Sequence, residues 1–196
     1  PTVHIRQKRH EISLGITQQA ALAIQNDLLQ REVLERERLE QEMQLARNIQ
    51  QTFLPDSLPL LENWDLDVRW KPAREVGGDF YDVILLPDNH LGIVIADVAD
   101  KGMPAALYMT LICTLIRAAA RELLSPAAVL KRVNEILVNE SKHGMFVTVA
   151  YAVIQLDTGE TSYANAGHNY PLLLSRNKSI TRLPTTAMAL GILEGI

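Results

Sequence analysis

The sequence predicts an α+β domain built on antiparallel sheet and preceded by a long helix. Residues 17–53 contain neither glycine nor proline, which indicates one uninterrupted helix. After Pro55, strand patterns, two helix patterns and further strand patterns follow one another in blocks. Such a block order favours antiparallel sheet over a βαβ repeat. A chain of 196 residues with 47% hydrophobic content can bury a substantial core.

The helix predicted over residues 17–53 carries a narrow apolar seam on a charged surface. Oppositely charged side chains one turn apart, Glu32 with Arg36 and Arg38 with Glu42, favour a solvated helix. A homodimeric coiled coil through residues 17–53 and a linker helix packed on its own domain both fit this pattern. The apolar positions at helical spacing are Ala21, Ile24, Leu28, Leu39, Met43, Ala46, Ile49 and Phe53.

The segment that follows predicts a hairpin. Residues 66–70 alternate apolar and charged side chains, which is typical of a half-buried strand. Residues 80–86 and 91–96 are two further strand candidates, separated by the turn residues 87–90.

Two helices and a strand-rich half complete the predicted order. Residues 105–124 predict a helix that is apolar on most sides, and Pro104 suits its first turn. A second helix starts at Ser125 and Pro126 and runs to about Glu140, because a cap residue followed by proline is a start signal. The last predicted strands cover residues 146–155, 161–165 and 172–175.

The hairpin brings two acidic residues together. A turn centred on residues 88 and 89 makes Leu86 face Leu91, so that Asp79 falls opposite Val98 and Asp97 opposite Phe80. Opposed residues have Cα atoms about 4.5–5.5 Å apart. Two carboxylates this close repel unless a cation neutralises them, and oxygen ligands favour Mg²⁺ or Mn²⁺. The alternative is that both aspartates only form turns at strand ends.

Composition excludes several other classes of protein. The formal net charge of −4 gives no basic surface for nucleic acid. One cysteine, Cys113, excludes an internal disulfide framework. No apolar run reaches the roughly 20 residues of a membrane span, and the charged N-terminus is not a secretory signal, so we expect a cytoplasmic protein.

Four segments stand out along the chain: 45–55 (LARNIQQTFLP), 75–82 (EVGGDFYD), 96–107 (ADVADKGMPAAL) and 164–173 (ANAGHNYPLL). In this order they resemble SpoIIE/RsbU-type phosphatases of the PPM (protein phosphatase 2C-like) superfamily. The resemblance covers the chain from about residue 39 to the end.

The resemblance implies an αββα sandwich that uses two Mn²⁺ or Mg²⁺ ions to hydrolyse phosphoserine or phosphothreonine on a partner protein. The implied partner is a phosphorylated anti-sigma-factor antagonist or a similar signalling protein. By motif, Asp79 is the metal-bridging carboxylate, and Asp97 and the Val98 carbonyl are further ligands. Gly78, Asp82, Asp100, His168 and Asn169 are additional candidates, with loop shaping favoured over acid catalysis for His168.

The resemblance also divides the chain. Residues 12–25 resemble the last helix of a GAF sensor, so residues 1–16 are read as the end of a sensor domain, 17–53 as a signalling helix and 54–196 as the phosphatase domain. The family continues past residues 190–192 into a further aspartate motif, which predicts a C-terminally truncated domain. A non-catalytic dimerising or partner-binding module is the alternative function.

Overall fold

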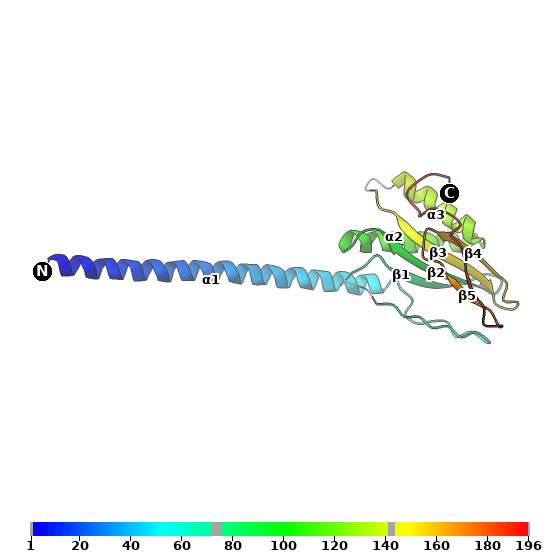
Figure 1. Cartoon of the computed structure of the whole chain (residues 1–196), viewed down its shortest axis with the longest axis horizontal. Helices are drawn as coiled ribbons and strands as arrows, with labels where there is room; N and C mark the ends of the chain where they lie inside the picture. Colours follow the sequence, from blue (N-terminus) through cyan, green and yellow to red (C-terminus); the bar gives the residue numbers. More distant parts are fainter. Residues whose placement is uncertain (1, 72–75, 141–143, 196) are drawn as a thin grey trace. The chain divides into compact units, whose positions relative to one another are not determined.

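A computed structural model describes residues 2–71, 76–140 and 144–195, with side chains from residue 15 onward except those of residues 16 and 140. The chain divides into two compact units, Pro1–Leu45 and Ala46–Ile196. The predicted mixture of helices and antiparallel sheet is confirmed (Figure 1).

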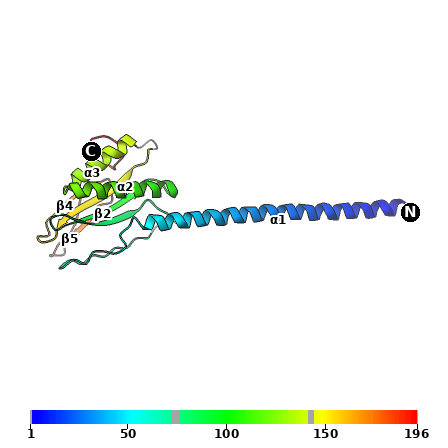
Figure 2. The same cartoon turned by 180° about the vertical axis from the view of Figure 1, so that it is seen from behind.

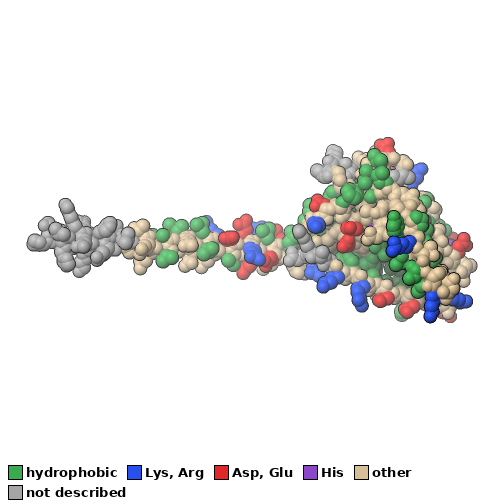
Figure 3. Space-filling view, viewed as in Figure 1, with side chains coloured by type: hydrophobic (Ala, Val, Ile, Leu, Met, Phe, Trp, Pro, Cys, Tyr) green, Lys and Arg blue, Asp and Glu red, His purple; other side chains and the backbone are tan. Residues whose placement is uncertain are grey.

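Helix α1 spans Thr2–Gln51, so it begins well before the predicted start at residue 17. Gly15 lies inside it, since a single glycine costs a helix only about 1 kcal/mol relative to alanine. Arg38 pairs with Glu42 as predicted, but Arg36 pairs with Glu40 instead of Glu32. Apolar and charged side chains alternate along the described part of this helix (Figure 3), and the seam residues Ile24, Leu28 and Leu39 are exposed in the single chain.

The second unit contains a four-stranded antiparallel sheet in the order β1-β2-β3-β4. Its strands are β1 (Phe80–Leu86), β2 (His90–Val98), β3 (Val147–Gln155) and β4 (Thr161–Ala166). Helices α2 (Met103–Glu122) and α3 (Pro126–Glu140) follow β2, as predicted. They lie on one face of the sheet, with α2 over β1 and β2 and α3 over β3 and β4 (Figures 1 and 2).

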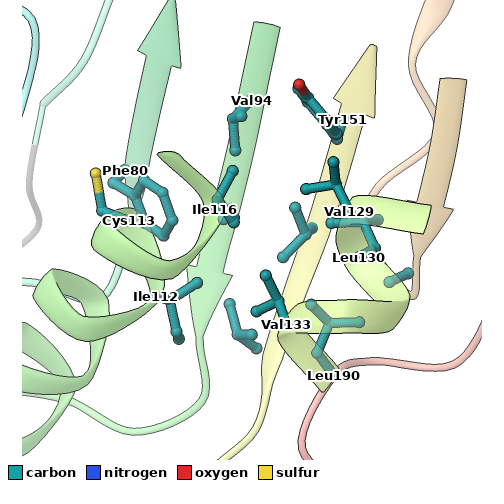
Figure 4. Packing of buried hydrophobic residues seen from close by; sticks show 14 of the residues in the cluster. Phe80, Val94, Ile112, Cys113, Ile116, Val129, Leu130, Val133, Tyr151 and Leu190 are labelled. Atoms are coloured by element: carbon teal, nitrogen blue, oxygen red, sulfur yellow. The ribbon is translucent and has the colours of Figure 1, made fainter. Parts of the chain in front are cut away.

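The core lies between these two helices and the sheet (Figure 4). Phe80, Val94 and Tyr151 point from the strands toward Ile112, Cys113 and Ile116 of α2 and toward Val129, Leu130 and Val133 of α3. Fully burying one such aliphatic or aromatic side chain stabilises the fold by roughly 1.5–3 kcal/mol. This packing fixes the β1–β2 hairpin, whose open end carries the acidic residues.

A separate two-stranded sheet pairs β5 (Leu172–Leu174) with β6 (Ile180–Arg182), a strand that the sequence pattern did not reveal. The predicted strand over residues 66–70 is wrong, because that segment has no ladder partner among the described residues. An alternation of apolar and charged residues shows that one face of a segment can be buried, but it does not show whether another strand lies beside it. Of the sandwich that the resemblance implied, the described residues contain one helix-covered sheet and this two-stranded sheet.

One helix of the described chain, α2, is long and apolar enough by length and composition to cross a membrane. Arg117 interrupts the apolar residues of this helix. Half of its apolar window is buried inside the second unit, as in the core helix of a globular domain, so this observation is weak evidence for a span.

Candidate metal centre

Asp79 and Asp97 lie opposite each other at the open end of the β1–β2 hairpin. Phe80 pairs with Ala96, and the same register continued by one residue sets Asp79 across from Asp97. The predicted register, with Asp79 opposite Val98, is therefore wrong by one residue. The correction brings the two carboxylates closer together than the sequence suggested.

The one-residue shift originates at the turn. Asp88 and Asn89 have φ of 54° and 56°, and the His90 N–H donates to the Pro87 carbonyl at 3.3 Å, which is the geometry of a type I′ turn. In a regular two-residue hairpin, Pro87 and His90 would exchange two hydrogen bonds. Proline has no N–H to donate, so the ladder closes instead on Leu86 and His90.

The two carboxyl groups perturb each other. Burial raises the pKa of the Asp97 carboxyl from its ordinary 3.8 to about 6, and both a hydrogen bond to Asp79 and the Asp79 charge add to the shift. Without a cation, two carboxyl groups in hydrogen-bond contact are stabilised by holding a proton between them. A divalent cation can replace that proton, so the donor set fits an oxygen-preferring metal.

The pair opens into a cavity of about 380 Å³. A Cβ on Gly78 would lie 2.8 Å from the Val98 carbonyl oxygen, so only glycine permits this close approach of the two chain segments. The Val98 N–H donates to the Gly78 carbonyl at 3.4 Å. The cavity is lined by Val76, Gly77, Gly78, Asp79, Asp97, Val98, Ala99, Asp100, Lys101 and Gly102.

Asp100 belongs to this cavity and adopts an unusual backbone conformation. Its φ is 110°, a region that costs a residue with a side chain on the order of 1–3 kcal/mol. Its Oδ1 accepts a hydrogen bond of 2.7 Å from the Lys101 N–H, which holds the loop in this shape. Asp100 is exposed and lines the cavity together with Asp79 and Asp97.

Asp82 lies elsewhere. It is buried, and its carboxylate accepts hydrogen bonds from the Arg117 Nε at 2.6 Å and Nη2 at 3.0 Å. Arg117 also donates to the Phe53 carbonyl at 2.9 Å, and the Cys113 sulfur lies 3.8 Å from Asp82 Oδ2. These contacts give Asp82 a structural role, in which it joins β1 to α2, and it does not line the cavity of Asp79 and Asp97.

The predicted His168 and Asn169 follow β4 in a loop that the buried Asn165 organises. Asn165 Oδ1 accepts from the His168 N–H at 2.8 Å, and its Nδ2 donates to the His168 carbonyl at 3.2 Å and to that of Asn169 at 3.5 Å. His168 Nδ1 lies 2.8 Å from the hydroxyl of Thr148, the strand partner of Asp97. Burial lowers the pKa of His168, and the Asp79 charge opposes that shift.

The described residues contain no cluster of three or more His, Cys, Asp or Glu that could hold a metal. Asp79, Asp97 and the Val98 carbonyl would thus provide part of a coordination shell, which Mg²⁺ and Mn²⁺ can complete with water. Glu75, the first residue of the segment 75–82 that carries the family resemblance, lies outside the described residues.

Two anchoring residues were not identified from the sequence. Gln50, 3% exposed, donates through Nε2 to the Gly77 carbonyl at 2.5 Å and accepts from the Gly77 N–H at 3.3 Å. The Trp70 indole donates to the Asp79 carbonyl at 3.1 Å. A signal for Gln50 existed, since it neighbours the apolar positions Ala46 and Ile49 near the end of the helix.

Residues 87–196, more than half of the chain, match the family described as Stage II sporulation protein E (SpoIIE). The chain belongs to the SpoIIE family. Protein IcfG of Synechocystis sp. (strain ATCC 27184 / PCC 6803 / Kazusa) is 34% identical over 220 residues, which cover 97% of this chain and 35% of IcfG. The phosphoserine phosphatase RsbU of Bacillus subtilis (strain 168) is 32% identical over 152 residues, covering 77% of this chain and 45% of RsbU.

The fold agrees with this membership. The SiaA-PP2C domain of Pseudomonas aeruginosa superposes with a TM-score of 0.66 at 22% identity, covering 80% of this chain and 64% of that one. The SpoIIE-family chain spans less than half the length of the curated relatives IcfG and RsbU.

Proposed function

We propose that this SpoIIE-family chain carries a metal-dependent protein serine/threonine phosphatase domain. The observation that carries the proposal is the Asp79–Asp97 pair, two acidic residues that lie opposite each other at the open end of the β1–β2 hairpin and line one cavity. The relative RsbU, which is named a phosphoserine phosphatase, supports the reaction type. RsbX, which shares the fold at a TM-score of 0.51 and 18% identity, has been solved in complex with magnesium.

In this proposal Asp79, Asp97 and the Val98 carbonyl would hold two Mn²⁺ or Mg²⁺ ions. Bound divalent cations would supply Lewis acidity toward the phosphoryl group and activation of water. The chain's own part is positional. Gly78 lets the two strand ends approach, Gln50 and Trp70 hold the backbone on either side of Gly78, and His168 shapes the adjoining loop.

We further propose a phosphorylated signalling protein of the anti-sigma-factor antagonist type as substrate, with regulation through α1. The last turn of α1 reaches the site, because Gln50 binds Gly77. The Phe53 carbonyl, just beyond this turn, binds Arg117 of α2. A homodimer through residues 17–53 would cover the exposed seam. The sensor boundary at residue 16 and the cytoplasmic location stay predictions.

The test is hydrolysis of a phosphoserine peptide by the whole chain with Mn²⁺, with Mg²⁺ and with EDTA. Asp97→Asn should abolish metal-dependent turnover. Asp88→Asn is the matched control, because Asp88 is an exposed turn residue of the same hairpin and asparagine tolerates its positive φ. Turnover that survives Asp97→Asn would refute the assigned role.

The non-catalytic alternative makes a different prediction. A partner-binding module would show no turnover under any metal condition. If the chain binds Mn²⁺ in a calorimetric titration but shows no turnover, the result favours a module that keeps the acidic pair for structural reasons.

A further inference from the structure

The charges around the cavity are unevenly distributed. Three of the described residues that line it are acidic, Asp79, Asp97 and Asp100, and one, Lys101, is cationic. A cation between Asp79 and Asp97 neutralises those two carboxylates. Lys101 therefore brings a positive charge to a cavity whose other charged lining residues are acidic.

Lys101 does not serve to neutralise its acidic neighbours. The carboxylate nearest in sequence, Asp100, accepts a hydrogen bond from the Lys101 backbone N–H at 2.7 Å. No ion pair of the Lys101 ammonium with any described carboxylate is present, although five other ion pairs are found in the same residues. The Lys101 side chain is exposed and keeps its donors available.

The backbone of Lys101 is nevertheless held in place. The Ala99 N–H donates to the Phe146 carbonyl at 2.9 Å, which ties the loop to the segment before β3. Asp100, with φ of 110°, and Gly102, with φ of 75°, bend the chain on both sides of Lys101. Helix α2 begins directly after the bend, at Met103. The loop therefore presents Lys101 at a set place on the wall that also carries Asp97.

We propose that Lys101 binds the phosphoryl oxygens of the substrate, as the cationic wall of a phosphate subsite beside the carboxylate pair. The inference rests on the proposed phosphatase function and adds a substrate-contacting residue to it. A phosphoserine side chain carries a charge of about −1.5 to −2 at neutral pH, and a lysine ammonium is a compact, mobile donor for such an anion. A phosphoryl group bound in this cavity would lie between a metal held by Asp79 and Asp97 on one side and the Lys101 ammonium on the other.

The experiment measures inorganic phosphate binding as well as turnover. Lys101→Met keeps the length of the stem and removes the charge, and Lys131→Met, at an exposed position of α3, is the matched control. We expect Lys101→Met to raise the Kd for phosphate on the Mn²⁺-loaded chain, measured by calorimetry, by about 10-fold or more, because hydrogen bonds between charged groups are lost. Its kcat/KM on a phosphoserine peptide should fall by a similar factor, while its affinity for Mn²⁺ without phosphate stays equal or increases.

The outcomes separate this inference from the phosphatase proposal. If the unaltered chain binds phosphate but shows no turnover, the phosphatase proposal fails and the Lys101→Met effect on phosphate binding still decides the subsite. If Lys101→Met binds phosphate as tightly as the unaltered chain, the subsite is refuted even where turnover is present. Absence of phosphate binding by the unaltered, Mn²⁺-loaded chain also refutes it. Lys101→Arg should retain most of the phosphate affinity, because charge and donors are kept.

Discussion

Arg117→Met tests whether the buried carboxylate of Asp82 depends on one cation. The Asp82 side chain is 3% exposed and that of Arg117 is 35% exposed, and two hydrogen bonds join them. The hydrogen bond to Asp82 raises the pKa of the Arg117 guanidinium above its ordinary value. Methionine retains much of the apolar stem of Arg117 but leaves Asp82 buried without its cation.

The magnitude follows from these contacts. Removing one partner of a buried ion pair costs about 3–5 kcal/mol, and the partial exposure of Arg117 favours the lower end because water can reach the site. Loss of the hydrogen bond to the Phe53 carbonyl adds about 1 kcal/mol. We therefore expect the free energy of unfolding to fall by about 3–4 kcal/mol, a large share of the 5–15 kcal/mol typical of a domain.

The assay is urea unfolding of the whole chain followed by the fluorescence of Trp64 and Trp70, both in the second unit. Arg121→Met, an exposed arginine one turn later on α2, should change stability by no more than about 0.5 kcal/mol. The double variant Asp82→Asn with Arg117→Met should recover at least about 1.5 kcal/mol, since no buried charge is then left unpaired. A loss below about 1 kcal/mol for Arg117→Met, or no recovery in the double variant, would refute this reasoning.

Three further predictions concern the carboxylate pair. Gln50→Ala leaves the N–H and the carbonyl of Gly77 without their partner and should weaken Mn²⁺ binding, measured by calorimetry, about 10-fold. Gln51→Ala, at the exposed neighbouring position, should leave Mn²⁺ binding unchanged. Equal Mn²⁺ affinities of the two variants would contradict the role of Gln50. Because the pKa of Asp97 is raised to about 6, the proton on the carboxyl pair stabilises the metal-free fold fully below about pH 4. This contribution to the free energy of unfolding is lost as the pH rises through 6. Mn²⁺ must displace that proton, so the affinity of the chain for Mn²⁺ should fall as the pH is lowered from about 7 to about 5. A Mn²⁺ affinity that is flat over that range would argue against a shared proton. Gly78→Ala, with its Cβ 2.8 Å from the Val98 carbonyl, should lower Tm and abolish Mn²⁺ binding, while Gly15→Ala in α1, with no atom near its Cβ, should leave Mn²⁺ binding unchanged.

Local signals predicted the parts of the site that are close in sequence. The turn residues between residues 86 and 91 and the apolar runs on either side were sufficient to predict the hairpin and the convergence of Asp79 with Asp97. The register failed by one residue because the missing N–H of Pro87 moves the ladder, a detail that residue alternation does not contain. Whether Asp79 and Asp97 bind metal is a separate question that the Mn²⁺ titrations address.

Contacts between distant segments could not be predicted. Asp82 belongs to an acidic motif in sequence, yet its partner Arg117 lies 35 residues away, and the pairing follows from the packing of α2 on β1. Gln50 and Gly77 are separated by 27 residues. The strand expected over residues 66–70 failed for the same reason, because pairing depends on a neighbour that the local pattern does not specify.

The packing of the hairpin explains why its two carboxylates lie close together. Their repulsion works against folding, but it acts only at the open end of the hairpin, one residue beyond the Phe80–Ala96 pair. The rest of the hairpin packs against α2, with Phe80, Val94 and Ala96 almost fully buried. Burial raises the pKa of Asp97, and the nearness of Asp79 adds to the shift, because a proton relieves part of the repulsion. The core therefore holds the pair together, and a cation that replaces the proton would gain affinity because the site needs little rearrangement.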